Sequence, residues 1–333
     1  MADRVALYLQ DDFTLQESID FVKYAEARGF ESVWQAESGF VRDSVVTVAA
    51  YATVTSRIKI GTGVMNIYTR NVATMASELL TLDDIAQDRI MCGLGSWYDD
   101  IAYQAGISRG KHLLAMREVL TTVRQLLAMQ NVRYRGQFVQ LNDLQLTVIS
   151  GRKEARHIPL FIGATGPAML ALAGEIADGV LLNYMVSPKY NEMAIRQLEI
   201  GLKQAGRAIY DIDRPQLIMC SVHQDRSVAL DIARRVVTQF IVQQPQLMRA
   251  NGIPQSLIDE ILLLNPVHSE HIEQASKLIP DDVVRMVTAS GNAQDVREKV
   301  REYIRSGATC PVLYPLNRNV RSLIDAFASG YSG

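Results

Sequence analysis

Residues 58–94, IKIGTGVMNIYTRNVATMASELLTLDDIAQDRIMCGL, contain the pattern that decides the fold. The apolar run Ile58–Val64 predicts a strand, Ala73–Ala86 predicts a helix, and Ile90–Leu94 predicts a second strand. Strands separated by a helix of about 10–15 residues pair in parallel through right-handed crossovers. The stretch therefore predicts one strand–helix–strand unit of a parallel sheet.

The same alternation extends in both directions along the chain. The predicted strands lie at residues 4–9, 32–35, 58–64, 90–94, 158–162, 179–182, 216–222 and 311–314. Helices separate them: Thr14 with Glu17 forms the capping-box pattern of one helix, and Ser227 is the predicted N-cap of another. Eight such units predict an α/β protein with a (β/α)₈ TIM barrel. A doubly wound open sheet is the competing fold, but it usually has about five or six strands.

The length of 333 residues exceeds what eight units need. At about 30 residues a unit, the barrel uses roughly 240 residues. The remainder falls in insertions at about 97–110, 132–149 and 243–288, so residues 1–333 are predicted to form a single domain. The first and last insertions follow strands four and seven and belong to the catalytic rim, where such barrels vary. The middle one alternates like a hairpin and precedes strand five, which predicts a place at the opposite end.

Composition excludes several classes of protein. The formal net charge is −2, from 34 basic and 36 acidic residues, so nucleic acid is not an expected partner. The three cysteines match no zinc or redox spacing, and His268 and His271 lack a third ligand, so no metal site is predicted. No signal peptide and no run of about 20 apolar residues is recognised, which predicts a cytoplasmic protein without membrane association.

The candidate chemistry lies just after the strands, because active sites of these barrels occupy the C-terminal ends of the strands. Gly163-Ala164-Thr165-Gly166 follows strand five, and Pro167 fits the first position of the next helix. Backbone N–H groups and the helix dipole there would hold a phosphate, with the Thr165 hydroxyl as a further donor. A tight turn without a ligand is the equally weighted alternative.

Two acids and an incomplete glycine motif occupy other rim loops. Asp11 and Glu37 follow strands one and two and are candidates for a general acid or base, or for an orienting acceptor. A solvated carboxylate or helix cap is at least as good an interpretation of Asp11. Gly93-Leu94-Gly95 is only part of a dinucleotide fingerprint, because Tyr98 stands where the third glycine is needed.

Several stretches together resemble the bacterial luciferase-like flavin superfamily. They are Gly29-Phe-Glu-Ser-Val-Trp34, Ala36-Glu37, Arg42-Asp43, Arg57–Arg70, Thr81-Leu82-Asp83, Gly93–Ser96, Gly163–Gly166 and Ala173–Asn183. The resemblance covers most of residues 3–240 and returns over 289–328. Within the superfamily, Asn66 to Arg70 and Gly163 to Asn183 look most like methylenetetrahydromethanopterin reductase, which uses the deazaflavin coenzyme F420.

The resemblance implies a TIM barrel that usually dimerises and binds FMN or F420 at its C-terminal rim. A non-prolyl cis peptide supports the rear face of the cofactor ring, and this position maps to Gly63-Val64. The implied phosphate site is Gly163 to Gly166, with Gly95 and Ser96 nearby, and Asn66 belongs to the implied cofactor site.

The departures from the family pattern bear on the reaction. Glu37-Ser38 stands where many F420 enzymes have Asp-His, and Tyr98 replaces a glutamate, whereas Asp11 keeps the acid after strand one. Asp11, Glu37 and Tyr98 are the candidates for proton transfer. The leading hypothesis is F420-dependent hydride transfer to or from a small organic substrate, with a pterin-like molecule among the candidates. The alternatives are an FMN-dependent monooxygenase that is supplied by a partner flavin reductase, and a non-catalytic flavin-binding barrel.

Overall fold

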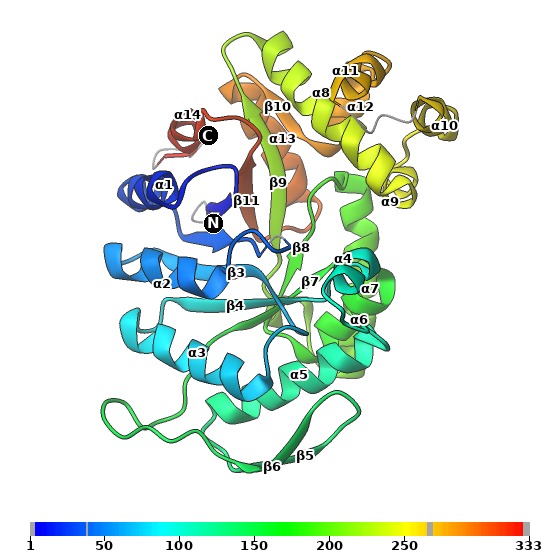
Figure 1. The fold of residues 1–333 in the computed structure, drawn as a ribbon. Coiled ribbons are helices and arrows are strands. Elements are labelled where there is room, and N and C mark those ends of the chain that lie inside the picture. Colours follow the sequence, from blue (N-terminus) through cyan, green and yellow to red (C-terminus); the bar gives the residue numbers. More distant parts are fainter. Residues whose placement is uncertain (1–3, 38, 265–268, 329–333) are drawn as a thin grey trace. The chain divides into compact units, whose positions relative to one another are not determined.

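A computed structural model describes residues 4–37, 39–264 and 269–328, and within them eight parallel strands form a closed barrel (Figure 1). The barrel strands are β1 (Ala6–Leu9), β2 (Ser32–Gln35), β3 (Lys59–Asn66), β4 (Ile90–Gly95), β7 (Leu160–Ala164), β8 (Gly179–Leu182), β9 (Pro215–Val222) and β11 (Cys310–Pro315). Their hydrogen-bonded order is β9-β11-β1-β2-β3-β4-β7-β8, and the pairing of β9 with β8 closes the ring. The predicted TIM barrel is confirmed.

The barrel strands are buried along almost their whole length. Every residue of β1, β2, β4 and β9 is buried, because side chains fill the interior of such a barrel and helices cover its exterior. Trp34 of β2 is among the largest buried side chains and packs edge-to-face on Phe161 of β7, with ring centroids 5.0 Å apart. Gly61 of β3 makes room for this indole, since a Cβ there would lie 2.6 Å from a Trp34 ring carbon.

Contacts divide the chain into two compact units, whose boundaries pass through the continuous strands β1 and β8. One unit contains residues Tyr8–Leu181 and Gln197–Asp213. Its helices are α1 (Leu15–Ala27), α2 (Ser44–Val54), α3 (Val72–Ile85), α4 (Asp99–Gln104), α5 (His112–Leu127), α6 (Pro167–Ile176), the second part of α7 (Pro188–Gln204) and the short 3₁₀ helix η1 (Ile209–Asp211).

The other unit contains the chain up to Leu7, Leu182–Arg196 and the chain from Arg214 on. It holds the first part of α7, then α8 (Arg226–Gln243), α9 (Pro245–Ala250), α10 (Gln255–Leu263), α11 (Ser269–Ser276), α12 (Asp281–Val287), α13 (Ala293–Arg305), α14 (Val320–Ala326) and a short strand β10 (Ala289–Gly291) that pairs with β9. The insertion at 243–288 therefore supplies α9 to α12. That the whole chain acts as a single domain stays a prediction.

The middle insertion forms the predicted antiparallel hairpin of β5 (Val132–Arg135) and β6 (Gln140–Leu144). Its predicted place at the end of the barrel opposite the rim stays a prediction. The hairpin starts after the end of α5, but its turn returns along this helix (Figure 1), and Glu118 accepts hydrogen bonds from the backbone of Gln137 and Val139, both 2.9 Å long. Gly110, just before α5, also lies against Phe138 of the turn.

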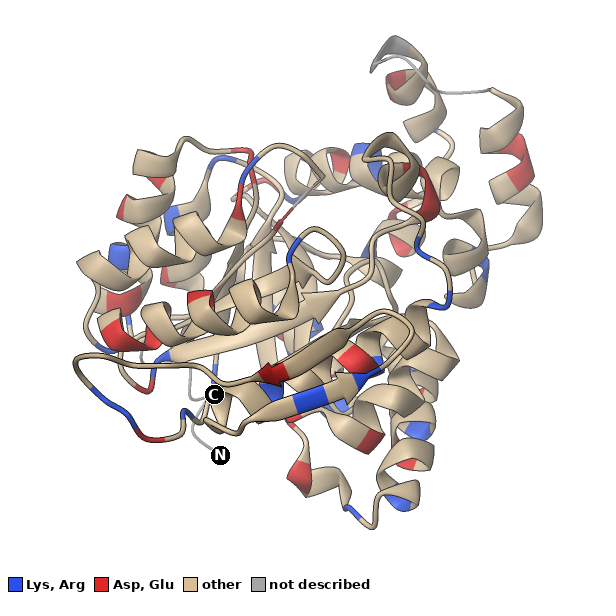
Figure 2. Ribbon diagram, turned by 60° about the horizontal axis from the view of Figure 1, so that its bottom comes forward, with Lys and Arg blue, Asp and Glu red and all other residues tan. Residues whose placement is uncertain are grey.

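Lys/Arg and Asp/Glu are interspersed along the ribbon (Figure 2). Cys92, Cys220 and Cys310 are free thiols and are buried, and burial raises the pKa of Cys92 to about 12. In the described part of the chain, no helix has both the length and the apolar character that a membrane span requires.

Candidate cofactor site

All residues predicted for the site lie in the unit that contains Tyr8–Leu181. They sit at the C-terminal ends of β1, β2, β3, β4 and β7, where their loops share one rim of the barrel. The peptide bond between Gly63 and Val64 is cis, as the family resemblance implies. It lies in β3 at an irregularity of the pairing with β4, between Thr62 and Met65.

The side chain of Val64 occupies a socket formed by three glycines on neighbouring strands. A Cβ on Gly95 would lie 2.2 Å from Val64 Cγ2, and a Cβ on Gly163 would lie 2.9 Å from Val64 Cγ1. Gly93 completes the socket, since a Cβ there would approach both Val64 Cγ1, at 3.2 Å, and the Thr62 carbonyl oxygen, at 2.3 Å. Gly95 and Gly163 are therefore required by the Val64 side chain, and Gly93 is required chiefly by the Thr62 carbonyl. The spacing of these glycines in the sequence does not reveal this.

Gly166 differs from the socket glycines. Its φ of −77° is ordinary for any residue, and a Cβ there would meet nothing within 4 Å. It is the N-cap of α6 without a side-chain capping bond, and Pro167 occupies the first turn as predicted. Glycine is among the residues that suit an N-cap, and the absence of a Cβ leaves the backbone N–H groups of this turn open to a ligand. The open space at Gly166 fits a bound phosphate.

The rest of this loop is more enclosed. Ala164 is buried and Thr165 is half-buried, as is Ser96 at the end of the neighbouring strand β4. β4 and β7 pair directly, so the two loops that contain the predicted phosphate ligands are adjacent. The structure thus brings the predicted phosphate-binding residues together on two neighbouring loops.

Asn66 ends β3 and has a buried donor without a hydrogen-bond partner in the described part of the chain. The residue is 1% exposed, and its Oδ1 accepts a hydrogen bond of 2.6 Å from the backbone N–H of Tyr68. Its Nδ2 is buried and has no hydrogen-bond partner among the residues that the structure describes. Buried donors are rarely left unpaired, so a polar ligand edge is a fitting partner for this amide.

Glu37 is held by donors on both carboxylate oxygens. Oε2 accepts a 2.7 Å hydrogen bond from the Ser44 hydroxyl, and Oε1 accepts from the backbone N–H of Asn66 at 3.3 Å. Arg70 Nη1 donates to the same carboxylate at 2.9 Å. The Glu37 side chain is only 7% exposed. These contacts favour a positioning role for this carboxylate at the end of β3.

Arg70 joins Glu37 to two further acids. Its Nη2 contacts Asp43 Oδ2, and its Nε lies 3.4 Å from Glu78 Oε2. Burial alone would lower the pKa of Arg70, but hydrogen bonding and charge from Glu37, with Asp43 and Glu78, raise it above its usual value. Burial raises the pKa of Glu78 even though Arg70 opposes the shift. The role of Arg70 was missed from the sequence, because nothing in its spacing connects it with Glu37.

Asp11 and Tyr98 occupy different surroundings. The Asp11 side chain is 12% exposed, and its Oδ1 lies 3.7 Å from Arg42 Nε. Tyr98 is the N-cap residue of α4 and is 54% exposed. Both stand at the rim, on the loops after β1 and β4. Their predicted part in proton transfer stays a prediction.

Metal ligands do not gather in the part of the chain that the structure describes. No group of three or more His, Cys, Asp or Glu side chains there is arranged to hold a metal ion. His268 lies outside the described residues.

Comparison with known proteins adds three findings. Residues 2–310 match the model of the luciferase-like monooxygenase family. The chain is 34% identical over 290 residues to the 5,10-methylenetetrahydromethanopterin reductase of Methanolobus tindarius, covering 87% of each chain. It is 32% identical over 294 residues to the enzyme of the same name from Archaeoglobus fulgidus, covering 87% of this chain and 86% of the relative.

Among solved structures, the coenzyme F420-dependent tetrahydromethanopterin reductase from Methanopyrus kandleri is similar over 98% of both chains. The TM-score is 0.87, and the sequences are 25% identical.

Proposed function

The chain belongs to the luciferase-like monooxygenase family, and from this premise we propose that it is an F420-dependent oxidoreductase that reduces or oxidises a pterin-like substrate. The observation that carries the proposal is the pairing of an open glycine at the first turn of α6 with the unsatisfied Asn66 amide at the end of β3. Both features are what a phosphate-bearing ring cofactor needs from the protein. The similarity to methylenetetrahydromethanopterin reductases favours a reduced pterin as the substrate class.

The cofactor is coenzyme F420, the coenzyme named for similar proteins. Its phosphate would be held by Gly163, Ala164, Thr165 and Gly166, with Gly95 and Ser96 from the adjacent loop. Gly63 and Val64 would support the rear face of its ring, and the Asn66 amide would donate to a polar edge. When bound, the deazaflavin supplies or accepts the hydride.

The protein's own contribution is positioning and proton transfer. Asp11, the enclosed acid after β1, is our first candidate for the group that exchanges a proton with the substrate, and the Tyr98 hydroxyl is the second. Glu37 acts through its neighbours: it fixes the backbone of Asn66 and holds Arg70.

Titration of the purified protein with F420 and with FMN, in separate experiments, tests the cofactor. We expect saturable F420 binding, followed by oxidation of reduced F420 when 5,10-methylenetetrahydromethanopterin is added. Binding of FMN alone would contradict the proposal. Oxygen uptake with reduced FMN would support a monooxygenase instead, and cofactor binding without turnover of any electron acceptor would leave a non-catalytic barrel.

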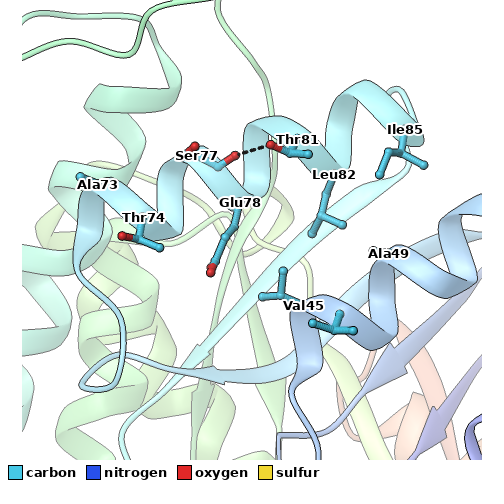
Figure 3. Close-up of a pocket in the computed structure, with 10 residues that line it drawn as sticks. Val45, Ala49, Ala73, Thr74, Ser77, Glu78, Thr81, Leu82 and Ile85 are labelled. Atoms are coloured by element: carbon cyan, nitrogen blue, oxygen red, sulfur yellow. Dashed lines mark hydrogen bonds between the residues drawn. The ribbon is translucent and has the colours of Figure 1, made fainter.

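We further propose that two copies of the chain pair through the groove between α2 and α3. The groove has a volume of about 600 Å³, and its lining is mostly apolar (Figure 3). Val45 and Ala49 of α2 face Leu82 and Ile85 of α3 across it (Figure 3). Val46 in its lining is 66% exposed, although apolar side chains grouped this way are usually covered. A cytoplasmic location completes the proposal.

A further inference from the structure

An aromatic pair joins the loops on either side of the end of β3. Phe40 belongs to the loop after β2, and Trp97 belongs to the loop after β4. Their ring centroids are 5.4 Å apart at an interplanar angle of 73°, an edge-to-face arrangement. Because β2 and β4 are the two neighbours of β3 in the barrel, the pair bridges the loops that flank Val64 and Asn66.

The two rings differ in what they offer to a ligand. Phe40 is 61% exposed, and the adjacent Val41 is 72% exposed, so an apolar ring with an accessible surface stands at the rim. Trp97 is half-buried, and its indole Nε1 is shielded from solvent without a hydrogen-bond partner in the described part of the chain. Indole N–H groups usually find a partner when they are buried. The pair therefore combines an open stacking surface with a donor that lacks an acceptor.

We propose that Phe40 and Trp97 form an aromatic clamp that recognises the planar heterocycle of the substrate. The heterocycle stacks on Phe40 and accepts a hydrogen bond from Trp97 Nε1 when the two rings separate. A pterin meets both requirements, because its fused ring is flat and carries a carbonyl oxygen and ring nitrogens along its edge. An aliphatic alcohol has no ring to stack. The inference rests on the proposed function and assigns substrate specificity to these two residues.

Intrinsic fluorescence can follow the clamp directly. The chain has two tryptophans, and the other one, Trp34, is 1% exposed in the barrel interior. F420-loaded protein is titrated anaerobically with tetrahydromethanopterin while tryptophan emission and the emission of F420 are both recorded. We expect saturable quenching of tryptophan emission in the wild-type protein and loss of that signal in Trp97→Phe.

The variants separate stacking from hydrogen bonding. Phe40→Ala should weaken tetrahydromethanopterin binding by about threefold to tenfold through lost stacking. Trp97→Phe keeps an aromatic ring but removes the donor, and should weaken binding by about fivefold. These affinities are measured by calorimetric titration, which does not depend on tryptophan. Tyr103→Ala is the matched control. Tyr103 is an aromatic residue in the insertion that contains Trp97, and it is 84% exposed.

Failure of the clamp and failure of the proposed function give different results. If F420 emission shows no binding, the proposed function fails. If F420 binds but tetrahydromethanopterin does not, the substrate class of the proposed function fails. If tetrahydromethanopterin binds Phe40→Ala and Trp97→Phe as tightly as it binds the wild type, the clamp is wrong. Unchanged F420 affinity in both variants, together with their weaker pterin binding, is the result that supports it.

Discussion

Glu37 connects the end of β3 to a cluster of charges through donors from Ser44, Asn66 and Arg70. A carboxylate accepts from all of these donors at once, whereas a carboxamide offers one acceptor oxygen and adds two donors. Glu37→Gln should therefore lower the free energy of unfolding by about 2 kcal/mol and the Tm by about 4 °C. F420 affinity should fall about tenfold, because the backbone of Asn66 loses an anchor. Calorimetry and F420 titration measure the two effects.

The exposed Glu260 of α10 provides a control for this substitution. Glu260→Gln makes the same chemical change without the buried contacts, and it should leave both quantities within error. If Glu37→Gln and the wild type had equal stability and equal F420 affinity, Glu37 would have no role in positioning the site.

A second prediction at the scale of residues concerns two glycines of the rim. Gly166→Ala should leave the Tm unchanged, because the added Cβ meets nothing within 4 Å, but should weaken F420 binding about tenfold or more, since the methyl group takes space expected for the phosphate. Gly95→Ala should instead lower stability by about 1–3 kcal/mol, because Val64 Cγ2 lies 2.2 Å from the new Cβ and a β-branched side chain cannot turn freely away.

The two effects are measured by thermal unfolding and by F420 titration of the same preparations. Val64→Ala added to Gly95→Ala should recover part of the lost stability. A Gly166→Ala protein that binds F420 like the wild type would show that the first turn of α6 is only a tight turn.

At the scale of elements, Glu118 of α5 holds the turn of the β5–β6 hairpin. Its carboxylate accepts from the backbone N–H groups of Gln137, Phe138 and Val139 at 2.8–2.9 Å. Burial acts to raise the pKa of Glu118, but these three donors outweigh it and hold the pKa below the ordinary 4.5. A lowered folded-state pKa contributes stability that is complete above the ordinary value and is lost as the pH falls through the lowered one.

The hairpin turn should accordingly loosen in acid before the barrel unfolds. We expect faster hydrogen exchange of the amides of residues 137–139, after correction for intrinsic rates, as the pH falls from about 5 to about 3. In Glu118→Gln this exchange should be fast at every pH, with a loss of about 1–3 kcal/mol of protection. Exchange in the wild type that stays equally protected over this range would contradict the linkage.

The sequence predicts elements better than it predicts their ends. Thr14 and Glu17 form the predicted capping box, because both partners lie within one turn and need no distant residue. Ser227 was wrong as an N-cap: Asp225 caps α8, and its carboxylate accepts from the backbone N–H of Ser227. Both residue types suit a cap, and spacing alone does not choose between them. The return of the hairpin turn to Glu118 was unforeseen, since it depends on a long-range contact.

At the scale of the whole molecule, we expect a substitution in the α2–α3 groove to change the assembly of the protein. Val46→Glu places a charge on an apolar lining residue that is 66% exposed, so it should weaken pairing at least tenfold without lowering the Tm. Size-exclusion chromatography with light scattering measures the mass across a dilution series. Ile149→Glu, at a loop residue that is 91% exposed, is the control. A wild-type protein that is monomeric at every concentration would refute the proposed pair.

The barrel could be predicted from the sequence, because the alternation of strands and helices repeats along the chain and each repeat is a local pattern. The functional residues of the rim could be predicted only in part. Its glycines and acids mark the right loops, but which glycine faces a ligand and which faces Val64 depends on contacts between β3, β4 and β7. Arg70 and the Phe40–Trp97 pair likewise join residues from different loops, so their roles emerge only when the barrel closes.

The Val64 socket also limits how this rim can be redesigned. Gly93 and Gly95 lie on β4 and Gly163 lies on β7, yet an added Cβ at any of them would crowd the side chain of Val64 on β3. A mutagenesis library that varies these positions one at a time would return mostly inactive clones, and the four positions would look immutable. A library that couples a smaller residue at 64 with alanine at Gly95 or Gly163 samples combinations that fit, whereas Gly93 stays fixed by the Thr62 carbonyl. The positions to vary together at this rim are therefore 64, 95 and 163, which are spread over about 100 residues of sequence.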